Sequence, residues 1–362
     1  MPIIFFLIIG LYLIANVYIY WRGGQALSTY PTGVKVLLSL LYWGGALSLI
    51  FTFLVRRSGI SMKLLSFTHE VGSSWLIFTL YMTLLLIVFD IIKLLYKPFT
   101  YGFLLAFALT LCVLSYGYYN YKNPKTKEYT LNVSKQAEVS SLRIVAISDI
   151  HLGVGTGKAA LSKYVDTINK LNPDLILISG DLIDNDVQPL IEEHMNEDIN
   201  SLTASYGVFM VPGNHEYIAG INESVKFINS TSIHLLRDST ITLPNGIQLI
   251  GRDDRHNHKR LPLSELSKQA DASKPIILLD HQPYELDQAV NAGVDLQVSG
   301  HTHRGQVWPL SLLTDYLFEL SYGYEKRQNT HFYVSSGLSL WGPPFRIGTD
   351  SEIVVFNLNF NE

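Results

Sequence analysis

The chain has 362 residues, of which 48% are apolar and 16% charged, so it is long enough for more than one domain. Its single cysteine, Cys112, excludes a disulfide framework and a cysteine-based zinc site. The net charge of -4 is unevenly spread, with ten Lys and Arg against three Asp and Glu in residues 1–128, and 17 against 28 in residues 129–362. The acidic second part has no basic stripe, which disfavours nucleic acid as a partner.

Residues 1–121 are predicted to form a transmembrane region. Four apolar runs follow one another, each about long enough to cross a hydrocarbon core of roughly 30 Å as a helix. We predict helices at about 2–21, 36–55, 72–96 and 99–119. A cleaved signal peptide is the alternative for the first run, but that run lacks a basic start and three more apolar runs follow it.

The orientation of these spans follows from their flanking charges, since four spans place both chain ends on the same side. Six basic residues would share that side: Arg56, Arg57, Lys63, Lys122, Lys125 and Lys127. Four would lie opposite, so the positive-inside rule favours a cytoplasmic second domain, at the inner membrane if the source is bacterial. Asp90 lies three residues before Lys93, and we predict a helical ion pair there rather than a proton or ion site.

The second part of the chain is predicted to be an α/β domain at 141–362, after a linker and first strand at 122–140. Short apolar runs alternate there with helical stretches, which is typical of such domains. The first five runs are 144–148, 175–179, 208–211, 276–279 and 296–299. Later runs at 246–251, 330–335 and 352–358 come in quicker succession, which indicates a second, mixed or antiparallel sheet.

Polar side chains of one chemical kind follow each of the first five runs. They are Asp149 and His151, then Asp181 and Asp184, then Asn214, His215 and Glu216, then Asp280 and His281, then His301 and His303. Ligands of open α/β sheets bind beyond the carboxyl ends of the strands, so these side chains are expected to converge. Carboxylate, amide oxygen and imidazole are donors that suit Mn, Fe and Zn. Asp181 is the natural bridge between two metal ions, because its turn is central in order and Gly180 lets the backbone bend.

Each of these motifs is weak by itself, since D-x-H is common and GDLID also reads as a turn with a helix cap. Their joint occurrence, at the same position after each run, makes the set specific. The histidines outside the motifs are interpreted as structural, namely His194, His234, His256, His258 and His331.

The five motifs in this order resemble the calcineurin-like metallophosphoesterases, whose pattern is D-x-H, G-D-x-x-D, G-N-H-(D/E), H and G-H-x-H. The GHTHRGQ block and residues 336–348 are similar to the bacterial membrane-associated branch of that family. The resemblance covers about residues 142–358 and not the four spans. It implies a metallophosphoesterase domain with a two-sheet β-sandwich core flanked by helices, behind the four-helix transmembrane region.

The resemblance also implies a site with two divalent metal ions. One ion would be held by Asp149, His151, Asp181 and His303. The other would be held by Asp181, Asn214, His281 and His301. The implied reaction is hydrolysis of a phosphoric ester by attack of a metal-bound hydroxide on phosphorus.

His215 would not bind metal in this scheme. It would contact the phosphate or protonate the leaving oxygen, and Asp184 would orient it, with a helix N-cap as the alternative role for Asp184. Arg304 stands where the related branch usually has a small residue, and Arg304 and Arg346 are predicted to bind the substrate phosphate. The alternative for Arg304 is a surface residue paired with an acid.

The four spans favour a substrate at the bilayer surface, and we expect a phosphodiester or pyrophosphate bond in a lipid or lipid-linked nucleotide sugar. Three alternatives stay open: hydrolysis of soluble nucleotides, a transporter with a regulatory domain, and a metal-bound scaffold. Asp90 and Asn16 are the notable polar residues of the spans, which is little for a transport path. A complete ligand set with His215 argues against a scaffold.

Overall fold

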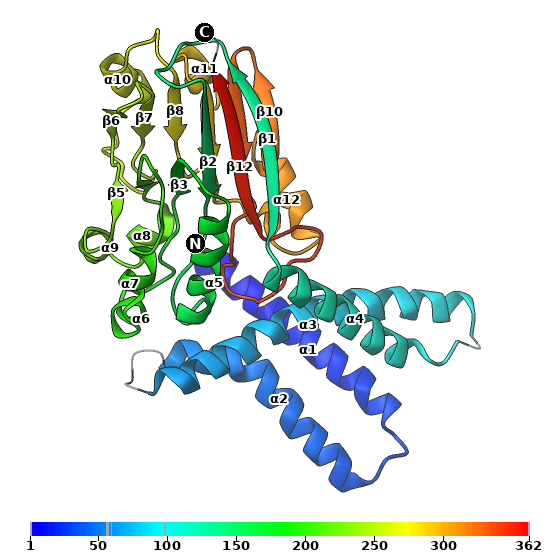
Figure 1. Ribbon diagram of the computed structural model, residues 1–362. Coiled ribbons are helices and arrows are strands. Elements are labelled where there is room, and N and C mark those ends of the chain that lie inside the picture. Colours follow the sequence, from blue (N-terminus) through cyan, green and yellow to red (C-terminus); the bar gives the residue numbers. More distant parts are fainter. Residues whose placement is uncertain (1, 56–57, 59, 98, 361–362) are drawn as a thin grey trace. The chain divides into compact units, whose positions relative to one another are not determined.

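The computed structural model describes residues 2–55, 58, 60–97 and 99–360 (Figure 1). It divides into two compact units. The helical unit consists of Met1–Tyr119 and Gly342–Ile347, and the catalytic unit of Asn120–Trp341 and Gly348–Glu362. The predicted fold class, four apolar helices followed by an α/β domain with two sheets, is confirmed.

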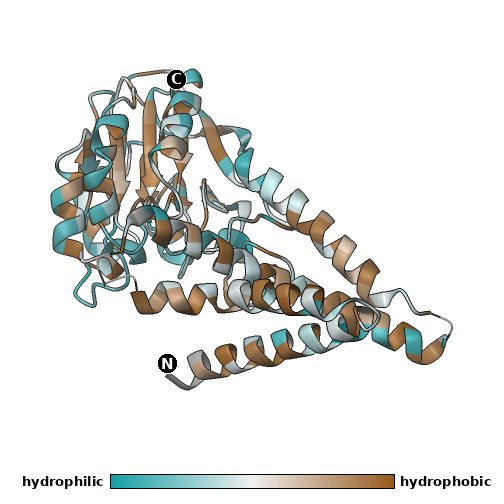
Figure 2. Ribbon diagram, turned by 90° about the horizontal axis from the view of Figure 1, so that it is seen from below, coloured by the Kyte–Doolittle hydropathy of each residue, from teal (hydrophilic) through white to brown (hydrophobic). Residues whose placement is uncertain are grey.

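Four long helices follow one another in the first 122 residues: α1 (Pro2–Ala26), α2 (Thr32–Val55), α3 (Met62–Leu95) and α4 (Gly102–Lys122). All four are long and apolar enough to cross a membrane, and the long helices in Figure 2 are brown over much of their length. The helix α3 begins ten residues before the predicted range 72–96, because a helix with Lys63 and Glu70 in its first turns can continue beyond the hydrocarbon core. Arg56 and Arg57, which entered the predicted orientation, lie outside the described residues.

Polar side chains join helices within the helical unit. The Asp90 carboxylate pairs with the Arg22 guanidinium of α1 at 2.6 Å and accepts a hydrogen bond from the Tyr18 hydroxyl. Its partner is therefore not Lys93, because the packing of α1 on α3 brings a basic side chain closer than the next helical turn does. The buried Asn16 oxygen accepts from the Tyr42 hydroxyl and the Trp75 indole, both at 3.0 Å, which ties α1 to α2 and α3.

The catalytic unit contains two six-stranded sheets. The first sheet has the order β1 (Lys125–Val133), β12 (Glu352–Phe360), β2 (Ser141–Ile147), β3 (Leu175–Ser179), β4 (Val208–Val211) and β5 (Ile233–Leu235). The second has the order β10 (Gly323–Arg327), β11 (Thr330–Val334), β9 (Leu296–Ser299), β8 (Ile276–Leu279), β7 (Gln248–Gly251) and β6 (Ser239–Thr242). The neighbours β2, β3 and β4 are parallel, and so are β8 and β9.

The strand at 352–358 was expected in the second sheet, and that prediction is wrong. The strand β12 pairs antiparallel with β2, so it lies in the first sheet between β2 and β1. It returns to the first sheet because its alternate side chains Val354, Phe356 and Leu358 join the apolar layer between the two sheets. Position in the chain is a poor guide here, since the last strand pairs with one of the first.

Helices and apolar side chains make the catalytic unit a four-layer structure. The layer between the sheets combines residues of both, for example Leu142, Leu177 and Leu279. The outer face of the first sheet packs on α5 (Lys158–Lys170), α6 (Gln188–Glu192), α7 (Met195–Ile199) and α9 (Ile221–Ile228). The outer face of the second packs on α10 (Leu263–Leu266) and α11 (Asp287–Asn291). The sheets are thus held rigidly at the strand ends that carry the polar motifs.

Four short elements complete the catalytic unit. The helix α8 (Asn214–Ile218) follows β4 directly, and the 3₁₀ turns η1 (Ser267–Gln269) and η2 (His303–Gly305) follow α10 and β9. The helix α12 (Leu310–Leu317) comes five residues after η2. Both α8 and η2 begin with residues of the sequence motifs, so the backbone turns sharply where those side chains are needed.

Candidate metal centre

All seven predicted metal ligands lie at the carboxyl ends of five strands, and the two packed sheets bring these ends together. The ends of β2, β3 and β4 supply ligands from the first sheet, and those of β8 and β9 supply ligands from the second. The sequence predicted the convergence but not the division of the ligands between two sheets. Each motif directly follows the end of its strand. The carboxyl ends of neighbouring parallel strands lie at the same edge of a sheet, so the motifs lie at that edge as well.

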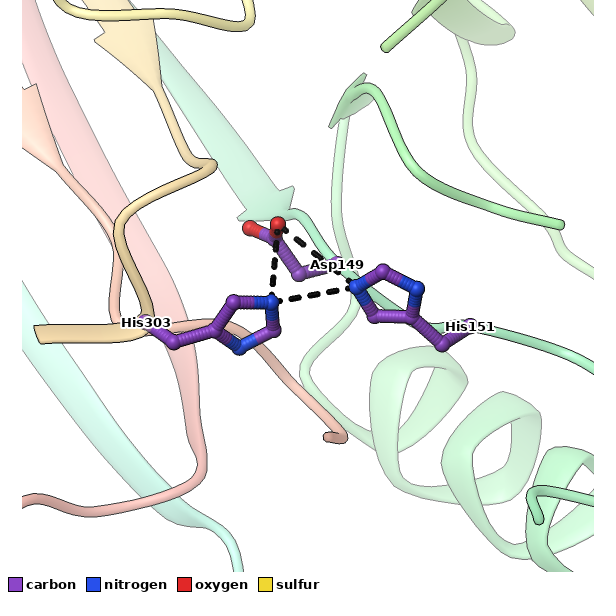
Figure 3. Close-up of side chains that lie close together, drawn as sticks. All are labelled: Asp149, His151 and His303. Carbon is purple, nitrogen blue, oxygen red and sulfur yellow. Dashed lines mark hydrogen bonds and ion pairs between the residues drawn. The ribbon is translucent and has the colours of Figure 1, made fainter. Parts of the chain in front are cut away.

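Three of the four predicted ligands of the first ion, Asp149, His151 and His303, face a common point (Figure 3). His303 Nε2 lies 3.4 Å from Asp149 Oδ1, and His151 Nε2 lies 3.9 Å from the same oxygen. The two ring nitrogens are 3.1 Å apart. All three side chains are largely withdrawn from solvent, so their lone pairs converge in a space that water hardly reaches.

The second predicted set converges in the same way. His281 Nε2 lies 3.1 Å from Asn214 Oδ1 and 3.2 Å from Asp181 Oδ2, and His301 Nδ1 lies 2.7 Å from Asn214 Oδ1. The other nitrogen of His281 is 2.7 Å from the Ser179 carbonyl, which fixes the ring and leaves Nε2 to face the shared point.

Asp181 faces both sets. Its Oδ2 lies 3.8 Å from His151 Nε2 and 3.2 Å from His281 Nε2, while its Oδ1 accepts from the His215 backbone N–H at 2.9 Å. Burial by itself raises the pKa of a carboxyl, but the charge and hydrogen bond of His281 outweigh that effect and lower the pKa of Asp181. A single ionised carboxylate therefore touches imidazoles of both sets.

The backbone conformation of the ligand residues is itself unusual. Five of the seven have a positive φ between 48° and 72°, a region that non-glycine residues rarely adopt: Asp149, His151, Asp181, His301 and His303. Such conformations persist only where surrounding structure enforces them, and they cluster at functional sites. Two glycines allow the close packing, since a Cβ on Gly213 would lie 2.1 Å from Asp181 Oδ1 and one on Gly300 2.3 Å from Asp149 Oδ2.

His215 is held beside the two sets by Asp184. Its Nδ1 donates to the Asp184 carbonyl at 2.8 Å, and the Asp184 carboxylate lies 3.5 Å from that nitrogen and 3.6 Å from His151 Nδ1. Although burial lowers the pKa of an imidazole, Asp184 and Asp181 raise the pKa of His215 to about 9. The helix N-cap alternative for Asp184 is wrong, because the next helix, α6, has Val187 at that position.

Glu216 has a structural role that the sequence did not reveal. Its fully buried carboxylate accepts from the backbone N–H groups of Asp181 at 3.1 Å, Ile183 at 3.0 Å and Gly213 at 2.7 Å. Burial and the nearby Asp181 charge raise the pKa of Glu216 to about 7. The side chain therefore joins the turn after β3 to the turn after β4, the two turns that present the central ligands.

Replacing Glu216 with alanine is expected to loosen these turns. Three buried N–H groups lose their acceptor, which at about 1 kcal/mol or more each costs roughly 3 kcal/mol of stability. The apparent Tm of the full chain should fall by about 6–12 °C, measured in EDTA so that metal loss does not contribute. Glu223→Ala on the exposed face of α9 is the matched control, and equal melting of the two variants would show that the cross-link contributes nothing.

The two predicted substrate arginines have different surroundings in the structure. The Arg304 guanidinium stacks over the Tyr322 ring, 4.7 Å from its centroid, instead of pairing with an acid. Arg346 is fully buried, and its backbone N–H donates to the Gly117 carbonyl at 2.9 Å, so it belongs to the helical unit. The roles of both in substrate binding stay predictions.

Aromatic rings that the sequence did not single out border the cluster. The Trp341 ring lies 6.1 Å from the His215 ring, and the Phe318 ring lies 5.9 Å from the His301 ring. Two histidines outside the motifs bond elsewhere, His256 to Asp254 and His331 to the Tyr324 hydroxyl. Sequence spacing could not assign Trp341 to the site, because it comes 126 positions after His215 in the chain.

The donor atoms fit divalent cations. Three groups each bring their ligand atoms within 4.8 Å of one another: Asp149 with His151 and His303, His151 with Asp181 and His215, and Asp181 with His281 and His301. A neutral imidazole can leave its Nε2 unprotonated, so the facing nitrogens of His151 and His303, 3.1 Å apart, can both offer a lone pair to a cation. Buried oxygen and imidazole donors around one shared carboxylate are the arrangement that a pair of ions needs.

Comparison with known proteins places this geometry in a family. The calcineurin-like phosphoesterase profile matches residues 142–305. A Campylobacter jejuni protein, named an uncharacterized metallophosphoesterase, is 31% identical over 376 residues that cover 98% of this chain and 97% of that protein. The chain belongs to the calcineurin-like metallophosphoesterases.

Two further relatives, each matched over about two thirds of this chain, agree with this assignment. A Helicobacter pylori (strain J99) protein, also named an uncharacterized metallophosphoesterase, is 35% identical over 241 residues, and the match spans 65% of this chain and 64% of that protein. A Danio rerio transmembrane protein with a metallophosphoesterase domain is 32% identical over 267 residues, 69% of this chain and 61% of that protein. Together with the four candidate spans, these relatives indicate a membrane protein that carries a metallophosphoesterase domain.

Proposed function

We propose that this chain is a membrane-anchored, binuclear metal-dependent phosphoesterase. The observation that carries the proposal is the pair of ligand sets that meet at Asp181, with His215 beside them. Asp149, His151, Asp181 and His303 would hold one ion, and Asp181, Asn214, His281 and His301 the other. When bound, two divalent ions supply charge for the phosphoryl oxygens and lower the pKa of the attacking water.

His215 is proposed as the catalytic acid. Its Nδ1 is engaged with the Asp184 carbonyl, so Nε2 is the nitrogen left for the substrate. The Asp184 carboxylate, 3.5 Å from Nδ1, favours the protonated ring, which can transfer a proton to the leaving oxygen. Asp184 holds the ring in place and balances its charge, and it also touches His151, so one carboxylate positions an acid and a metal ligand.

The proposed substrate is a phosphodiester or pyrophosphate bond in a lipid or lipid-linked nucleotide sugar. Four candidate spans support this choice, since an enzyme held at the bilayer meets membrane substrates at high local concentration. The acidic catalytic part supports the exclusion of nucleic acid. The positive-inside count supports a cytoplasmic catalytic unit.

A substrate panel tests this proposal. The full chain, loaded with Mn, Fe or Zn, is compared on lipid pyrophosphates, lipid phosphodiesters and soluble cyclic nucleotides. We expect hydrolysis of a lipid substrate with a higher kcat/KM than any soluble ester. Efficient cleavage of cyclic nucleotides with no cleavage of any lipid would instead favour the soluble-nucleotide alternative.

Arg304→Ala is expected to raise KM several-fold, with a smaller effect on kcat. Arg304 is the residue after the proposed ligand His303. Its guanidinium can leave the Tyr322 ring, on which it stacks, and bind a phosphoryl oxygen. Arg304→Lys should give an intermediate KM, because an ammonium keeps the charge without the bidentate geometry. Steady-state kinetics of both variants decide the point, and an unchanged KM for Arg304→Ala removes Arg304 from substrate binding.

A further inference from the structure

The helix α12 (orange in Figure 1) leaves its large apolar side chains exposed. Leu312 is 60% exposed, Leu313 54% and Tyr316 86%, whereas the small polar Ser311 is buried. This is the reverse of a surface helix in a soluble domain, which turns its apolar stripe to the core. The same segment adds Trp308, Leu310 and Leu317, each about half exposed, so exposed apolar side chains occur from one end of Trp308–Leu317 to the other.

This apolar segment is fixed against the metal-ligand loops at both of its ends. Before α12, Gly305 of η2 has a φ of +68° and packs so tightly that a Cβ there would lie 2.4 Å from the Leu310 carbonyl carbon. After α12, the next residue is Phe318, whose ring lies 5.9 Å from the ring of His301. A membrane or a protein that contacts α12 would therefore lie close to the metal-ligand loops.

Trp341 is a further exposed aromatic side chain, and it lies beside His215. Its side chain is 56% exposed, and its ring lies 6.1 Å from that of His215. The chain passes from Trp341 directly into Gly342–Ile347, which belongs to the helical unit. The covalent link to the candidate spans is at Tyr119–Asn120, and the six residues that follow this tryptophan also group with the helical unit.

The chemistry of the segment matches a lipid bilayer. Leucine with tryptophan and tyrosine is the composition of helices that lie in the membrane interface, and contiguous exposed apolar side chains mark such contact surfaces. Asp315 is the only charged residue in Trp308–Leu317, so apolar burial, and not attraction of basic side chains to anionic lipids, would drive the contact. The covalent link to the four candidate spans at Tyr119–Asn120 keeps a bilayer within reach of the segment.

We propose that Trp308–Leu317 and Trp341 lie in the bilayer interface and hold the metal centre at the level of the lipid head groups. A head-group phosphate would then reach the ligands without the lipid leaving the membrane. This deepens the proposed function and rests on it for the substrate, but the contact with the bilayer requires no turnover. The two ideas can therefore fail separately.

The test uses the full chain in phosphatidylcholine vesicles. In a Cys112→Ser background, which removes the only native thiol, Tyr316→Cys is labelled with a nitroxide. Accessibility to lipid-soluble oxygen and to a water-soluble nickel complex is measured by power-saturation spectroscopy. Thr167→Cys, at an exposed site on α5, is the matched control. We expect the ratio of oxygen to nickel accessibility at 316 to exceed the ratio at 167 several-fold.

Two results would overturn the proposal. Equal ratios at 316 and 167 would show that α12 faces water. Protection of the 316 label from both reagents would show that protein covers it, either the helical unit or a second copy. Leu313→Cys gives a second position, which must behave like 316. A label in the bilayer together with no hydrolysis of any lipid would retain the contact and refute the proposed substrate.

Discussion

Asp181→Asn is expected to lose metal and activity together. Asparagine keeps an oxygen for the His215 N–H, so the backbone around β3 should persist. It removes the charge that faces His151 and His281, and with it the ligand proposed to bridge two ions. We expect the metal content to fall below two ions per chain. The decrease in kcat should exceed the ~10–100-fold decrease that is typical when a residue hydrogen-bonded to a metal ligand is replaced.

Asp166→Asn, at an exposed position of α5, is the matched control for this variant. It makes the same chemical change outside the cluster and should retain both metal and activity. Metal content by mass spectrometry and hydrolysis of bis-p-nitrophenyl phosphate give the two readouts. A variant at 181 that keeps two ions and full kcat would remove Asp181 as the bridge.

His215→Gln is expected to lose activity while it retains both metal ions. The side chain lies beside the ligand sets and its Nδ1 is engaged with Asp184, so metal binding should not depend on it. Loss of a general acid costs about 10²–10⁴-fold in kcat. The loss should be smaller for a p-nitrophenyl ester than for an alkyl ester, because p-nitrophenolate leaves without protonation.

This dependence on the leaving group separates a catalytic acid from a structural histidine. His258→Gln in the exposed loop after β7 serves as the control and should match the unaltered chain on both esters. An equal loss for both leaving groups would assign His215 to phosphate binding instead. A loss of metal in His215→Gln would make it a ligand, as its nearness to His151 and Asp181 permits.

The sequence was sufficient to predict that the proposed ligand residues converge, because their positions depend on local rules. Asp149, Asp181 and Asn214 each follow a buried strand, and parallel neighbours end at one edge, so their convergence needs no knowledge of side-chain packing. His281 and His301 obey the same rule, but on a second sheet. Which sheet a strand joins depends on long-range pairing, and for that reason the placement of β12 was wrong.

The remaining features depend on contacts between distant residues. Glu216 accepts from N–H groups of two separate turns, and its sequence position only marks it as acidic. Asp90 meets Arg22 because α1 packs on α3, a pairing 68 residues apart that no helical spacing indicates. The surface of α12 had a detectable signal in the sequence, a run from Trp308 to Phe318 with one charge, but its outward orientation required the structure.

The central claim is that the chain holds two divalent ions in a site that hydrolyses phosphoric esters. The most direct measurement is the metal content of the purified full-length protein, taken with its activity on bis-p-nitrophenyl phosphate before and after chelation. We predict two ions per chain, and activity that disappears with EDTA and returns with Mn, Fe or Zn. A chain with no bound divalent metal and unchanged hydrolysis in EDTA would contradict the assignment.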